Sequence, residues 1–467
     1  MADTLLHNAS LVTVNGRRET LEKHSLLIRD DRIHDIGPAD EMKSRYKDAG
    51  RIIDASDKVV FPGMINTHNH LFQTLLKGLG DDLVLSDWLS TMTFPSGVYL
   101  EPEHTYAASS LGCLEGIQSG TTTMVDYMYP HPREGLDDGV IKGFKRLGIR
   151  GFFGRGMMDT GEKYGTPTGI MQTLPEIEKD LVRLFDTYHN SEEGRIKIWI
   201  SPAAIWSSSE ESLKRTWELA RHYKTGYSVH ISETPFDREA AQDLHGLPDA
   251  EVLEKFGILG PEVLMVHCVY LTDRDIRMAK HYDLKVSHNP VSNMYLSSGV
   301  ARIPRMLESG ITVGLGTDGP ASNNSQDMVE LLKFTALLQK VHSLDPTVLS
   351  ADKVLEMATI DGARAIGMED ELGSLEVGKK ADLFVYNPKR TAKSVPNHNP
   401  VSTIVYAGTH ASVETVFVDG RPLMEDGKLT VDAEENIIDE GQKAAEDLAR
   451  KAGTIENKYR RWRTLAF

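Results

Sequence analysis

Residues 62–70 read Pro-Gly-Met-Ile-Asn-Thr-His-Asn-His, an apolar segment that ends in two histidines, His68 and His70. Side chains two positions apart on a β-strand point to the same face, so both imidazoles can reach one metal ion. If this segment opens a barrel of parallel strands, the pair lies at the carboxyl end, where such barrels keep their active sites. Taken alone, the pattern also fits two unrelated histidines, so the interpretation as a metal site depends on other residues of the chain.

From about residue 59, short β-branched segments alternate with longer segments that carry apolar residues at helical spacing. Eight strand segments can be counted, at residues 59–66, 121–127, 149–158, 196–204, 227–232, 263–269, 284–290 and 312–319. Helical patterns lie between them, for example at residues 103–119, 174–189, 210–224, 273–281 and 326–340. Repeated βα units close into a parallel barrel. The sequence therefore predicts an α/β fold whose main domain is a TIM-type (β/α)8 barrel over residues 59–369.

The flanks of this barrel have a different pattern, in which short strands alternate with turns such as Asp30-Asp31 and Asp419-Gly420. The strand segments are residues 5–14, 24–30 and 32–37 before the barrel, and residues 381–386 and 413–419 after it. We expect the flanks to pair into a small β-sandwich domain formed by residues 1–58 plus 370–432. A charged, helical tail over residues 433–467 is expected to pack on the outside.

The composition of the 467-residue chain is that of an ordinary globular protein, with 40% hydrophobic and 26% charged residues. Its formal charge of -16 repels phosphate backbones and anionic lipid headgroups, so nucleic acid is not an expected partner. Cys113 and Cys268 are the only cysteines, which excludes a disulfide framework and favours a reducing compartment. No long apolar stretch or basic leader is present, so a cytoplasmic protein without a membrane span is expected.

Three more of the strand segments end in polar residues. Residues 227–233 end in His230-Ile-Ser-Glu233, residues 265–268 contain His267, and residues 313–319 contain Asp318. A buried polar side chain needs a partner, so a histidine or aspartate at the end of an apolar strand is costly as simple packing. We expect these side chains to converge with His68 and His70 at the open end of the barrel.

His68, His70 and His230 with the Asp318 carboxylate form an N3O set that suits Zn²⁺ first and Fe²⁺ as the alternative, with one position left for water. A bound divalent ion lowers the pKa of its water towards ~7, so hydroxide becomes available at neutral pH. Glu233 and His267 then remain as the pair that handles protons.

At this point the sequence resembles the amidohydrolase superfamily, in the branch that contains guanine, cytosine and S-adenosylhomocysteine deaminases and triazine hydrolases. The resemblance covers nearly the whole chain. It rests on residues 62–70, on His230-x-x-Glu233, on His267, on Ser287-His288-Asn289-Pro290, on residues 316–324 and on the late segment 373–383.

The resemblance implies that His68, His70, His230 and Asp318 bind one metal ion. It also implies that Glu233 shuttles a proton to a ring nitrogen and that His267 polarises the bound water or the oxyanion. Physical reasoning agrees, because Asp318 can take the proton of the nucleophilic water and pass it to the departing amine. The expected products are a carbonyl compound and ammonia.

Two competing motifs are rejected. Residues 314–319 fit G-x-G-x-x-G, but Pro320 follows at once and the carboxylate of Asp318 lies inside the motif, so a dinucleotide site is not expected. Lys197 lies on the fourth strand, where related two-metal hydrolases carry a carboxylated lysine. A solvated lysine at the start of a strand is the simpler interpretation, since the His230-x-x-Glu233 arrangement makes a second metal unnecessary.

Four residues are candidates for binding substrate: Gln73, Trp88, Arg155 and Asn289. Gln73 follows His70 and can hydrogen-bond an amide or amidine edge of a ring, or it is an ordinary loop amide. Arg155 can bind a carbonyl or an anion, or it pairs with an acidic neighbour in the fold. Trp88 lies in a long insertion that caps the pocket in similar enzymes, or it is only a loop anchor.

The predicted function is metal-dependent hydrolytic deamination of a small heterocyclic substrate: a purine, pterin, pyrimidine or triazine. The nucleoside deaminases it resembles usually carry an acidic residue after the tryptophan, whereas residues 93–97 here read Thr-Phe-Pro-Ser-Gly, which favours a free base, pterin or triazine over a nucleoside. The alternatives are dechlorination or dealkylamination of a triazine, deamination of an adenosine-type nucleoside, and a metal-free binding or assembly protein. Homo-oligomers are common in such families, but no interface can be identified in the sequence.

Overall fold

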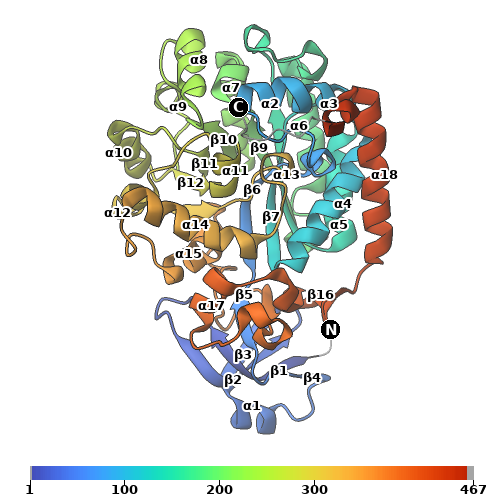
Figure 1. The fold of residues 1–467 in the computed structure, drawn as a ribbon, viewed down its shortest axis with the longest axis vertical. Helices are drawn as coiled ribbons and strands as arrows, with labels where there is room; N and C mark the ends of the chain where they lie inside the picture. The colour runs from blue at the N-terminus through green and yellow to red at the C-terminus, as the bar shows by residue number, and fades with distance from the viewer. Residues whose placement is uncertain (1–2, 460–467) are drawn as a thin grey trace, which may run out of the picture.

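The computed structural model describes residues 3–459, and within them the strands form two separate sheets (Figure 1). The larger sheet has eight strands that follow one another in chain order, and each neighbouring pair is parallel. Its strands are β6 (Met64–Asn69), β7 (Thr121–Met128), β8 (Arg150–Met157), β9 (Ile196–Pro202), β10 (Tyr227–Ile231), β11 (Val263–His267), β12 (Lys285–His288) and β13 (Val313–Leu315).

The first and last strands of this sheet lie next to each other. The Thr67 hydroxyl donates a hydrogen bond of 2.9 Å to the carbonyl of Leu315, and the Asp318 amide donates one of 3.0 Å to the carbonyl of His68. The sheet is therefore closed by polar contacts between its two ends. The predicted (β/α)8 barrel, with a β-domain built from the flanks, is confirmed.

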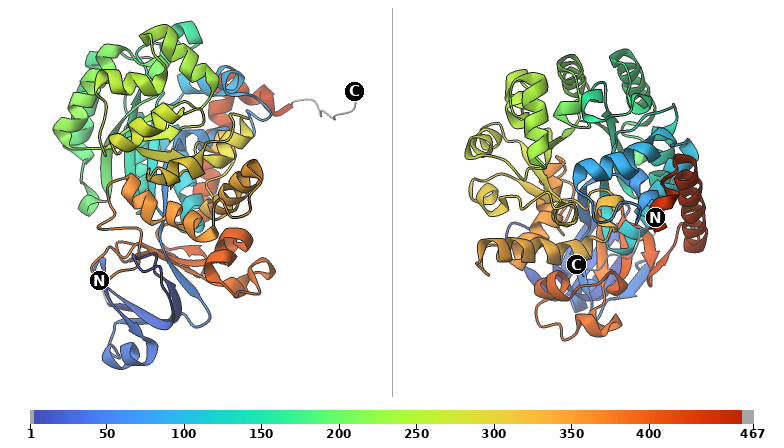
Figure 2. Two further views of the ribbon diagram at one scale, coloured as in Figure 1. Left: turned by 90° about the vertical axis from the view of Figure 1, so that its left-hand side faces the viewer. Right: turned by 45° about the horizontal axis from the view of Figure 1, so that its top comes forward.

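Helices cover the outside of the barrel, as the view in Figure 2 with its top turned forward shows. They begin where the sequence supplies caps: the Thr173 amide donates to the Glu176 carboxylate, and the Thr272 amide to that of Asp275. These helices are α2 (Leu85–Trp88), α3 (Phe94–Val98), α4 (Pro102–Gln118), α5 (Leu136–Leu147), α6 (Leu174–Tyr188), α7 (Glu210–Tyr223), α8 (Pro235–His245), α9 (Asp249–Phe256), α10 (Asp273–His281), α11 (Pro290–Tyr295), α12 (Ile303–Glu308), α13 (Pro320–Asn323), α14 (Met328–Ser343), α15 (Ala351–Ala358) and α16 (Ile360–Ala365).

Shorter helical turns occur in the loops. A π-helical turn, η2 (Leu89–Thr93), joins α2 to α3 above the barrel. The 3-10 turns are η1 (Leu71–Leu76), η3 (Glu162–Tyr164), η4 (Thr168–Ile170), η5 (Glu192–Gly194), η6 (Ile205–Ser207), η7 (Pro388–Arg390), η8 (Ala392–Ser394), η9 (His410–Ser412) and η10 (Thr454–Tyr459).

The segment 59–66, predicted as one strand, is two strands that belong to different sheets. β5 (Val59–Pro62) pairs with strands of the flanking sheet, and β6 begins the barrel at Met64. Gly63 lies between them, and a Cβ atom there would come within 2.1 Å of the Thr122 hydroxyl oxygen. The chain therefore passes from one sheet to the other at a residue that has to be glycine.

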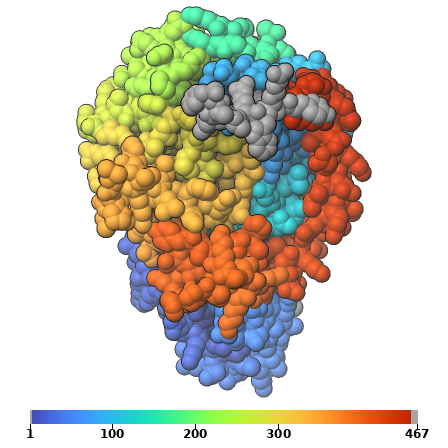
Figure 3. Space-filling view, in the orientation of Figure 1, coloured from blue at the N-terminus to red at the C-terminus, as the bar shows by residue number. Residues whose placement is uncertain are grey.

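The flanking sheet has nine strands drawn from both ends of the chain, and its own apolar core includes Leu6, Leu26, Val60, Leu383 and Phe417. Figure 3 shows these N-terminal and C-terminal segments together below the barrel. The strands are β1 (Thr4–Val12), β2 (Thr20–Arg29), β3 (Arg32–Pro38), β4 (Arg51–Asp54), β5, β14 (Leu383–Tyr386), β15 (Val413–Val418), β16 (Arg421–Glu425) and β17 (Lys428–Leu429), with the helices α1 (Ala39–Arg45) and α17 (Pro400–Ala407).

The C-terminal part of the chain contains one long helix, α18 (Glu434–Ala452), which runs along the side of the barrel (Figure 1). It is joined to α4 by an ion pair of 3.0 Å between His104 and Asp447. The predicted helical tail extends to residue 467, and its last part, residues 460–467, lies outside the described residues. None of the helices in residues 3–459 is both long and apolar enough to cross a lipid bilayer.

A buried cluster of charges joins the barrel to the flanking sheet. The Arg150 side chain, at the start of β8, is 1% exposed and donates two hydrogen bonds of 3.0 Å to Asp382. It donates a third, of 2.5 Å, to Asp419. Charges buried this deeply are tolerated only when they are paired, so each member of the cluster depends on the others.

We expect the substitution Arg150→Met to lower the free energy of unfolding by about 3–5 kcal/mol, because the buried Asp382 loses its cation and Asp419 keeps only the longer pairs with Lys380 and Arg195. Urea titration followed by circular dichroism measures this loss. The matched control is Arg215→Met, which breaks an exposed ion pair with Glu178 and should leave stability nearly unchanged. Equal, small effects of both substitutions would contradict the structural role of Arg150.

Candidate active site

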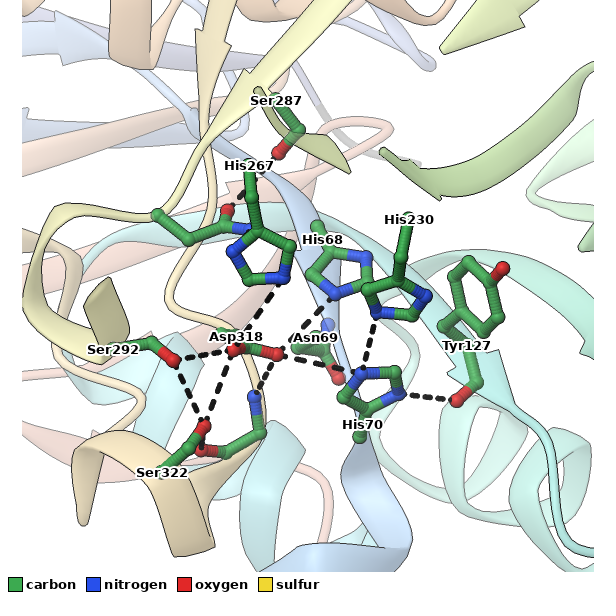
Figure 4. Close-up of polar contacts among 12 residues, drawn as sticks. His68, Asn69, His70, Tyr127, His230, His267, Ser287, Ser292, Asp318 and Ser322 are labelled. Atoms are coloured by element: carbon green, nitrogen blue, oxygen red, sulfur yellow. Dashed lines mark hydrogen bonds and ion pairs between the residues drawn. The ribbon is translucent and has the colours of Figure 1, made fainter. Parts of the chain in front are cut away.

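Four side chains from three barrel strands meet at the carboxyl end of the barrel (Figure 4). Asp318 Oδ1 lies 3.3 Å from His68 Nε2 and 3.4 Å from His70 Nε2. His230 Nε2, from β10, lies 3.3 Å from His70 Nε2. The structure thus brings together the four residues predicted as metal ligands, and one ligand atom from each histidine lies within 4.8 Å of the other two.

Backbone carbonyls fix the orientation of two of these imidazoles. His70 Nδ1 donates a hydrogen bond of 2.6 Å to the carbonyl of Tyr127, and His230 Nδ1 donates one to the carbonyl of Ala203. A carbonyl only accepts, so both rings carry their proton on Nδ1 and turn the Nε2 lone pair towards the centre. Metal-binding histidines have this arrangement.

The charge state of the three imidazoles also suits a metal ion. Burial lowers the pKa of His68 to about 3 and lowers the pKa values of His70 and His230 as well. Neither ring nitrogen of His68 makes a hydrogen bond within the described residues, although the ring is fully buried. Neutral rings with unused lone pairs beside a carboxylate fit a divalent cation, which would satisfy these atoms.

Asp318 is held in an unusual backbone conformation three residues beyond β13, with a φ of 61°. The Gly319 amide donates to its Oδ1 at 2.7 Å, and the Ser292 hydroxyl donates to its Oδ2 at 2.5 Å. Burial by itself would raise the pKa of the Asp318 carboxyl, but that pKa lies well below its ordinary value, and the two hydrogen bonds that the carboxylate accepts favour its ionised form. Asp318 is therefore ionised.

Glu233 and His267 lie on one side of this centre. Glu233 Oε2 is 3.5 Å from His267 Nε2, and the Ser298 hydroxyl donates to Glu233 Oε1 at 3.1 Å. Burial, and then the charges of Asp237 and Asp318, raise the pKa of Glu233 well above its ordinary value. A carboxyl group whose pKa is raised keeps its proton to higher pH and can act as an acid in the site.

His267 ends β11 with a φ of 70°, and its Nε2 atom is 4.0 Å from Asp318 Oδ2. The side-chain amides of Asn289 and Asn293 contact its other nitrogen, Nδ1, at 3.3 Å and 3.0 Å. Burial lowers the pKa of His267 to about 3, so the ring is neutral. Its Nε2 atom faces both carboxylates of the site from a fixed position.

These polar groups lie at the floor of a cavity with mostly apolar walls. Apolar walls around a few convergent polar groups are typical of a site for a small organic ligand. The walls are formed by Gln73, Leu85, Trp88, Leu89, Phe94, Tyr129, Met158, Ala203, Ala204, Trp206, Asp237, Leu296 and Ser322.

Gln73 and Trp88, two of the candidate substrate-binding residues, line this cavity. One end of the Gln73 amide is hydrogen-bonded to the Tyr129 hydroxyl at 3.2 Å, while its other end has no partner within the described residues. The Trp88 indole nitrogen donates to the carbonyl of Ala321 at 2.9 Å, so the ring offers the cavity an apolar surface. Gln73 is thus the side chain with unused hydrogen-bonding capacity.

The other two candidates, Arg155 and Asn289, do not line the cavity. Arg155 is buried behind it and donates to Asp180 at 3.0 Å and to Gln172 at 2.6 Å, so its guanidinium is already paired. This is the structural alternative that the sequence left open, and it corrects the expectation of a substrate contact. Asn289 contacts His267 instead of lining the cavity, so it can affect a bound substrate only through His267.

Three cavity residues, Tyr129, Trp206 and Asp237, had no place in the sequence prediction. Tyr129 and Trp206 lie one residue past β7 and four past β9, at the open end of the barrel. Asp237 lies in the first turn of α8 and completes a capping box with Thr234. The two aromatic residues could have been predicted as cavity residues from their positions just beyond barrel strands. Asp237 could not, because its role in the capping box already explains an aspartate at that position.

Asp126, on β7, is a further buried carboxyl that the sequence did not reveal. Its Oδ1 atom accepts a hydrogen bond of 2.7 Å from the Leu71 amide, directly after His70. Its Oδ2 atom has no partner in the described part of the chain. Burial raises the pKa of Asp126 from 3.8 to about 7.

The native state therefore holds this proton more tightly than the unfolded chain, and this contribution to stability is lost as the pH rises from 3.8 through about 7. Asp126→Asn keeps the acceptor for Leu71 but cannot ionise. We expect the melting temperature of the variant, relative to wild type, to rise between about pH 5 and about pH 8. Parallel melting curves for the two proteins across this range would contradict the raised pKa.

The comparisons with known proteins agree with this geometry. The model of the amidohydrolase family matches residues 59–423. The 5'-deoxyadenosine deaminase of Methanobrevibacter smithii is 39% identical over 429 residues, which cover 91% of this chain and 94% of that protein. A 5-methylthioadenosine/S-adenosylhomocysteine deaminase of Syntrophomonas wolfei is 35% identical over 451 residues, which cover 96% and 99%. The crystal structure of an adenosine deaminase from Xanthomonas campestris with bound zinc has a TM-score of 0.89 at 26% identity, covering 96% and 99%.

The chain therefore belongs to the amidohydrolase family. It is a hydrolase that acts on C–N bonds, and within the family it is a deaminase, as the resemblance predicted. Members of this family are typically metal-dependent, which agrees with the cluster of histidines and Asp318.

Proposed function

We propose that this chain removes the amino group of a 6-aminopurine ring by hydrolysis and releases ammonia. The observation that carries the proposal is the convergence of His68, His70, His230 and Asp318 beneath an apolar cavity, with Glu233 beside them. The 6-aminopurine is chosen within the wider class of aminated heterocycles because the three relatives described above are named for adenosine-type substrates.

The proposed ligands of the metal ion are Nε2 of His68, His70 and His230 and a carboxylate oxygen of Asp318. Three imidazoles and one carboxylate suit Zn²⁺, and the adenosine deaminase structure described above contains zinc. Such an ion, if held by these residues, would supply a water molecule of lowered pKa as the nucleophile.

The remaining steps belong to the chain's own residues. Asp318, ionised and fixed by Ser292 and Gly319, accepts a proton from the attacking water and returns it to the departing amine. Glu233, whose pKa is raised by burial, donates its proton to a ring nitrogen and takes back the second proton of the water from the added hydroxyl group as the carbonyl forms. His267 Nε2, between these two carboxylates, orients the oxygen that develops on the attacked carbon.

The cavity walls hold and orient the ring. Trp88, Phe94 and Trp206 supply flat apolar surfaces, and the free end of the Gln73 amide can bind one polar edge of the ring. A buried amide that lacks a partner costs free energy until substrate satisfies it, so Gln73 favours rings with a matching donor or acceptor.

The second candidate substrate is a nucleoside, in which the purine ring carries a sugar. The similarity to 5'-deoxyadenosine and methylthioadenosine deaminases favours a nucleoside as substrate. Against this, residues 93–97, which follow Trp88, include no carboxylate that could bind ribose hydroxyls. Adenine itself is therefore the first candidate and 5'-deoxyadenosine the second.

One assay tests the proposal and separates the two candidates. The zinc-loaded protein is incubated with adenine, 5'-deoxyadenosine, guanine, pterin and a chlorinated triazine, and both ammonia and chloride are measured. Ammonia from adenine or 5'-deoxyadenosine supports the proposal, and the ratio of their kcat/KM values identifies the preferred form. Chloride from the triazine, or ammonia only from pterin or guanine, would refute it.

A further inference from the structure

The chain makes a short turn between His230 and Glu233. β10 ends at Ile231 and α8 begins at Pro235, so Glu233 lies in neither a strand nor a helix. Ser232, the first residue of this turn, is fully buried and has a φ of 50°. A residue other than glycine keeps a positive φ only where its surroundings enforce it, so the contacts of Ser232 determine the shape of the turn.

Ser232 is held by a buried carboxylate that lies outside the cavity. The Ser232 amide donates to Asp249 Oδ2, and the Ser232 hydroxyl donates to Asp249 Oδ1 at 2.7 Å. Asp249 is the first residue of α9, is 1% exposed and does not line the cavity. The Ser232 carbonyl accepts a hydrogen bond of 2.9 Å from the Tyr270 amide. The amide, the hydroxyl and the carbonyl of Ser232 are therefore all bonded.

The Asp249 carboxylate has further partners that fix it in place. Its Oδ1 atom accepts a hydrogen bond of 2.9 Å from the Ala250 amide at the start of the same helix. The Arg238 guanidinium lies 4.0 Å from Asp249 Oδ1 and donates to the Ser232 hydroxyl oxygen at 3.3 Å. A buried carboxylate with several donors and a nearby cation has little freedom to move, so it holds Ser232 rigidly.

The two residues that flank this turn depend on it to different degrees. His230 lies within β10, and the carbonyl of Ala203 orients its ring, so the barrel fixes His230 before the chain reaches Ser232. Glu233 follows Ser232 directly, and the turn sets the direction in which the Glu233 side chain leaves the backbone. Loss of the contact with Asp249 should therefore displace Glu233 and leave His230 in place.

We propose that Asp249 is a positioning residue of the active site, which aims the Glu233 carboxyl at the substrate ring by holding Ser232. The inference rests on the proposed function, since it takes Glu233 as the proton donor. Asp249 itself exchanges no proton with the substrate. A reacting group misplaced by about 1 Å can cost ~10²-fold in rate, so a contact behind the cavity wall can have a large effect on turnover.

The test compares the full-length, zinc-loaded wild type with Asp249→Ala, using adenine and 5'-deoxyadenosine as substrates. We expect the substitution to lower kcat for ammonia release by about 10–100-fold, while KM and the zinc content change by less than about twofold. The matched control is Asp159→Ala, because Asp159 also accepts from the amide and the hydroxyl of one serine, Ser209, but at the start of α7. The control should keep wild-type kcat. Wild-type kcat in Asp249→Ala would overturn the inference.

A double-mutant cycle separates the positioning of Glu233 from general damage to the fold. If Asp249 acts through Glu233, then Asp249→Ala should not lower the residual kcat of Glu233→Gln any further. A loss of the same size in both backgrounds would overturn the inference. Asp249→Asn keeps one oxygen that can face the Ser232 amide, so its kcat should lie between those of Asp249→Ala and wild type. It replaces the alanine variant in the cycle if that variant does not fold.

The two proposals fail in distinguishable ways. If wild type releases ammonia and Asp249→Ala does so equally fast, the deaminase proposal stands and the role given to Asp249 is wrong. If wild type releases no ammonia, the proposed reaction is wrong, and a crystal structure of Asp249→Ala still tests the position of Glu233. In that structure Glu233 Oε2 should leave its place 3.5 Å from His267 Nε2, and an unmoved Glu233 would overturn the inference.

Discussion

His68→Ala is expected to abolish metal binding and, with it, turnover. His68 is fully buried, its two ring nitrogens have no hydrogen-bond partner in the described part of the chain, and Nε2 lies 3.3 Å from Asp318. Substitution of residues that only support the ligands weakens metal affinity by up to ~100-fold, so the loss of a direct ligand should weaken it by more than that. Turnover should fall by at least ~10³-fold, since the ion contributes several kcal/mol.

Elemental analysis of the purified variant measures the metal, and ammonia release measures turnover. His222→Ala, an exposed histidine on α7, is the matched control and should retain both the metal and activity. Stoichiometric zinc in a folded His68→Ala protein would show that the proposed ligand set is wrong. Wild type treated with a chelator should lose activity in the same way and recover it when zinc is returned.

The strand ends were the part of the site that the sequence predicted well. His68, His70, His230 and Asp318 each follow an apolar β-segment, and a parallel barrel collects all such ends at one rim. Two-residue periodicity and strand order are local properties, so they can be read from the chain. The proximity of these four side chains follows from topology and needs no knowledge of loop conformation.

The walls of the cavity could not be predicted in the same way. Trp206 and Tyr129 lie in loops, and whether a loop residue lines a cavity depends on contacts with segments far away in the chain. Arg155 is the opposite case, a residue of a barrel strand that does not line the cavity. It pairs with Asp180 of α6, and the strand pattern could not predict that these two residues lie side by side. The alternatives stated for Arg155 were equally compatible with the sequence.

The boundary between the two sheets was not predicted, for a different reason. Residues 59–66 are apolar almost throughout, so periodicity cannot show that the chain changes sheets within them. The change occurs at Gly63, where the Thr122 hydroxyl leaves no space for a Cβ atom. A glycine inside a strand pattern was the available signal, and only the contact with Thr122 gives it a meaning.

Glu233→Gln is expected to retain the metal but to lose a factor of ~10²–10⁴ in kcat, the usual contribution of a positioned proton donor. The amide is nearly the same size, and it can still accept a hydrogen bond from the Ser298 hydroxyl. Glu233 is also 3.5 Å from His267 and is not among the proposed ligands. The variant therefore removes a proton without removing the ion, which separates chemistry from metal binding.

The pH dependence provides an independent readout. Because burial raises the pKa of Glu233 well above its ordinary value, wild-type kcat should fall on the alkaline side as this proton is lost. The residual activity of Glu233→Gln should lack that alkaline fall. Glu239→Gln, on the exposed side of α8, is the matched control and should reproduce wild type. Wild-type kcat in Glu233→Gln would exclude proton donation by Glu233, whereas loss of zinc from the variant would instead make this residue part of the metal site.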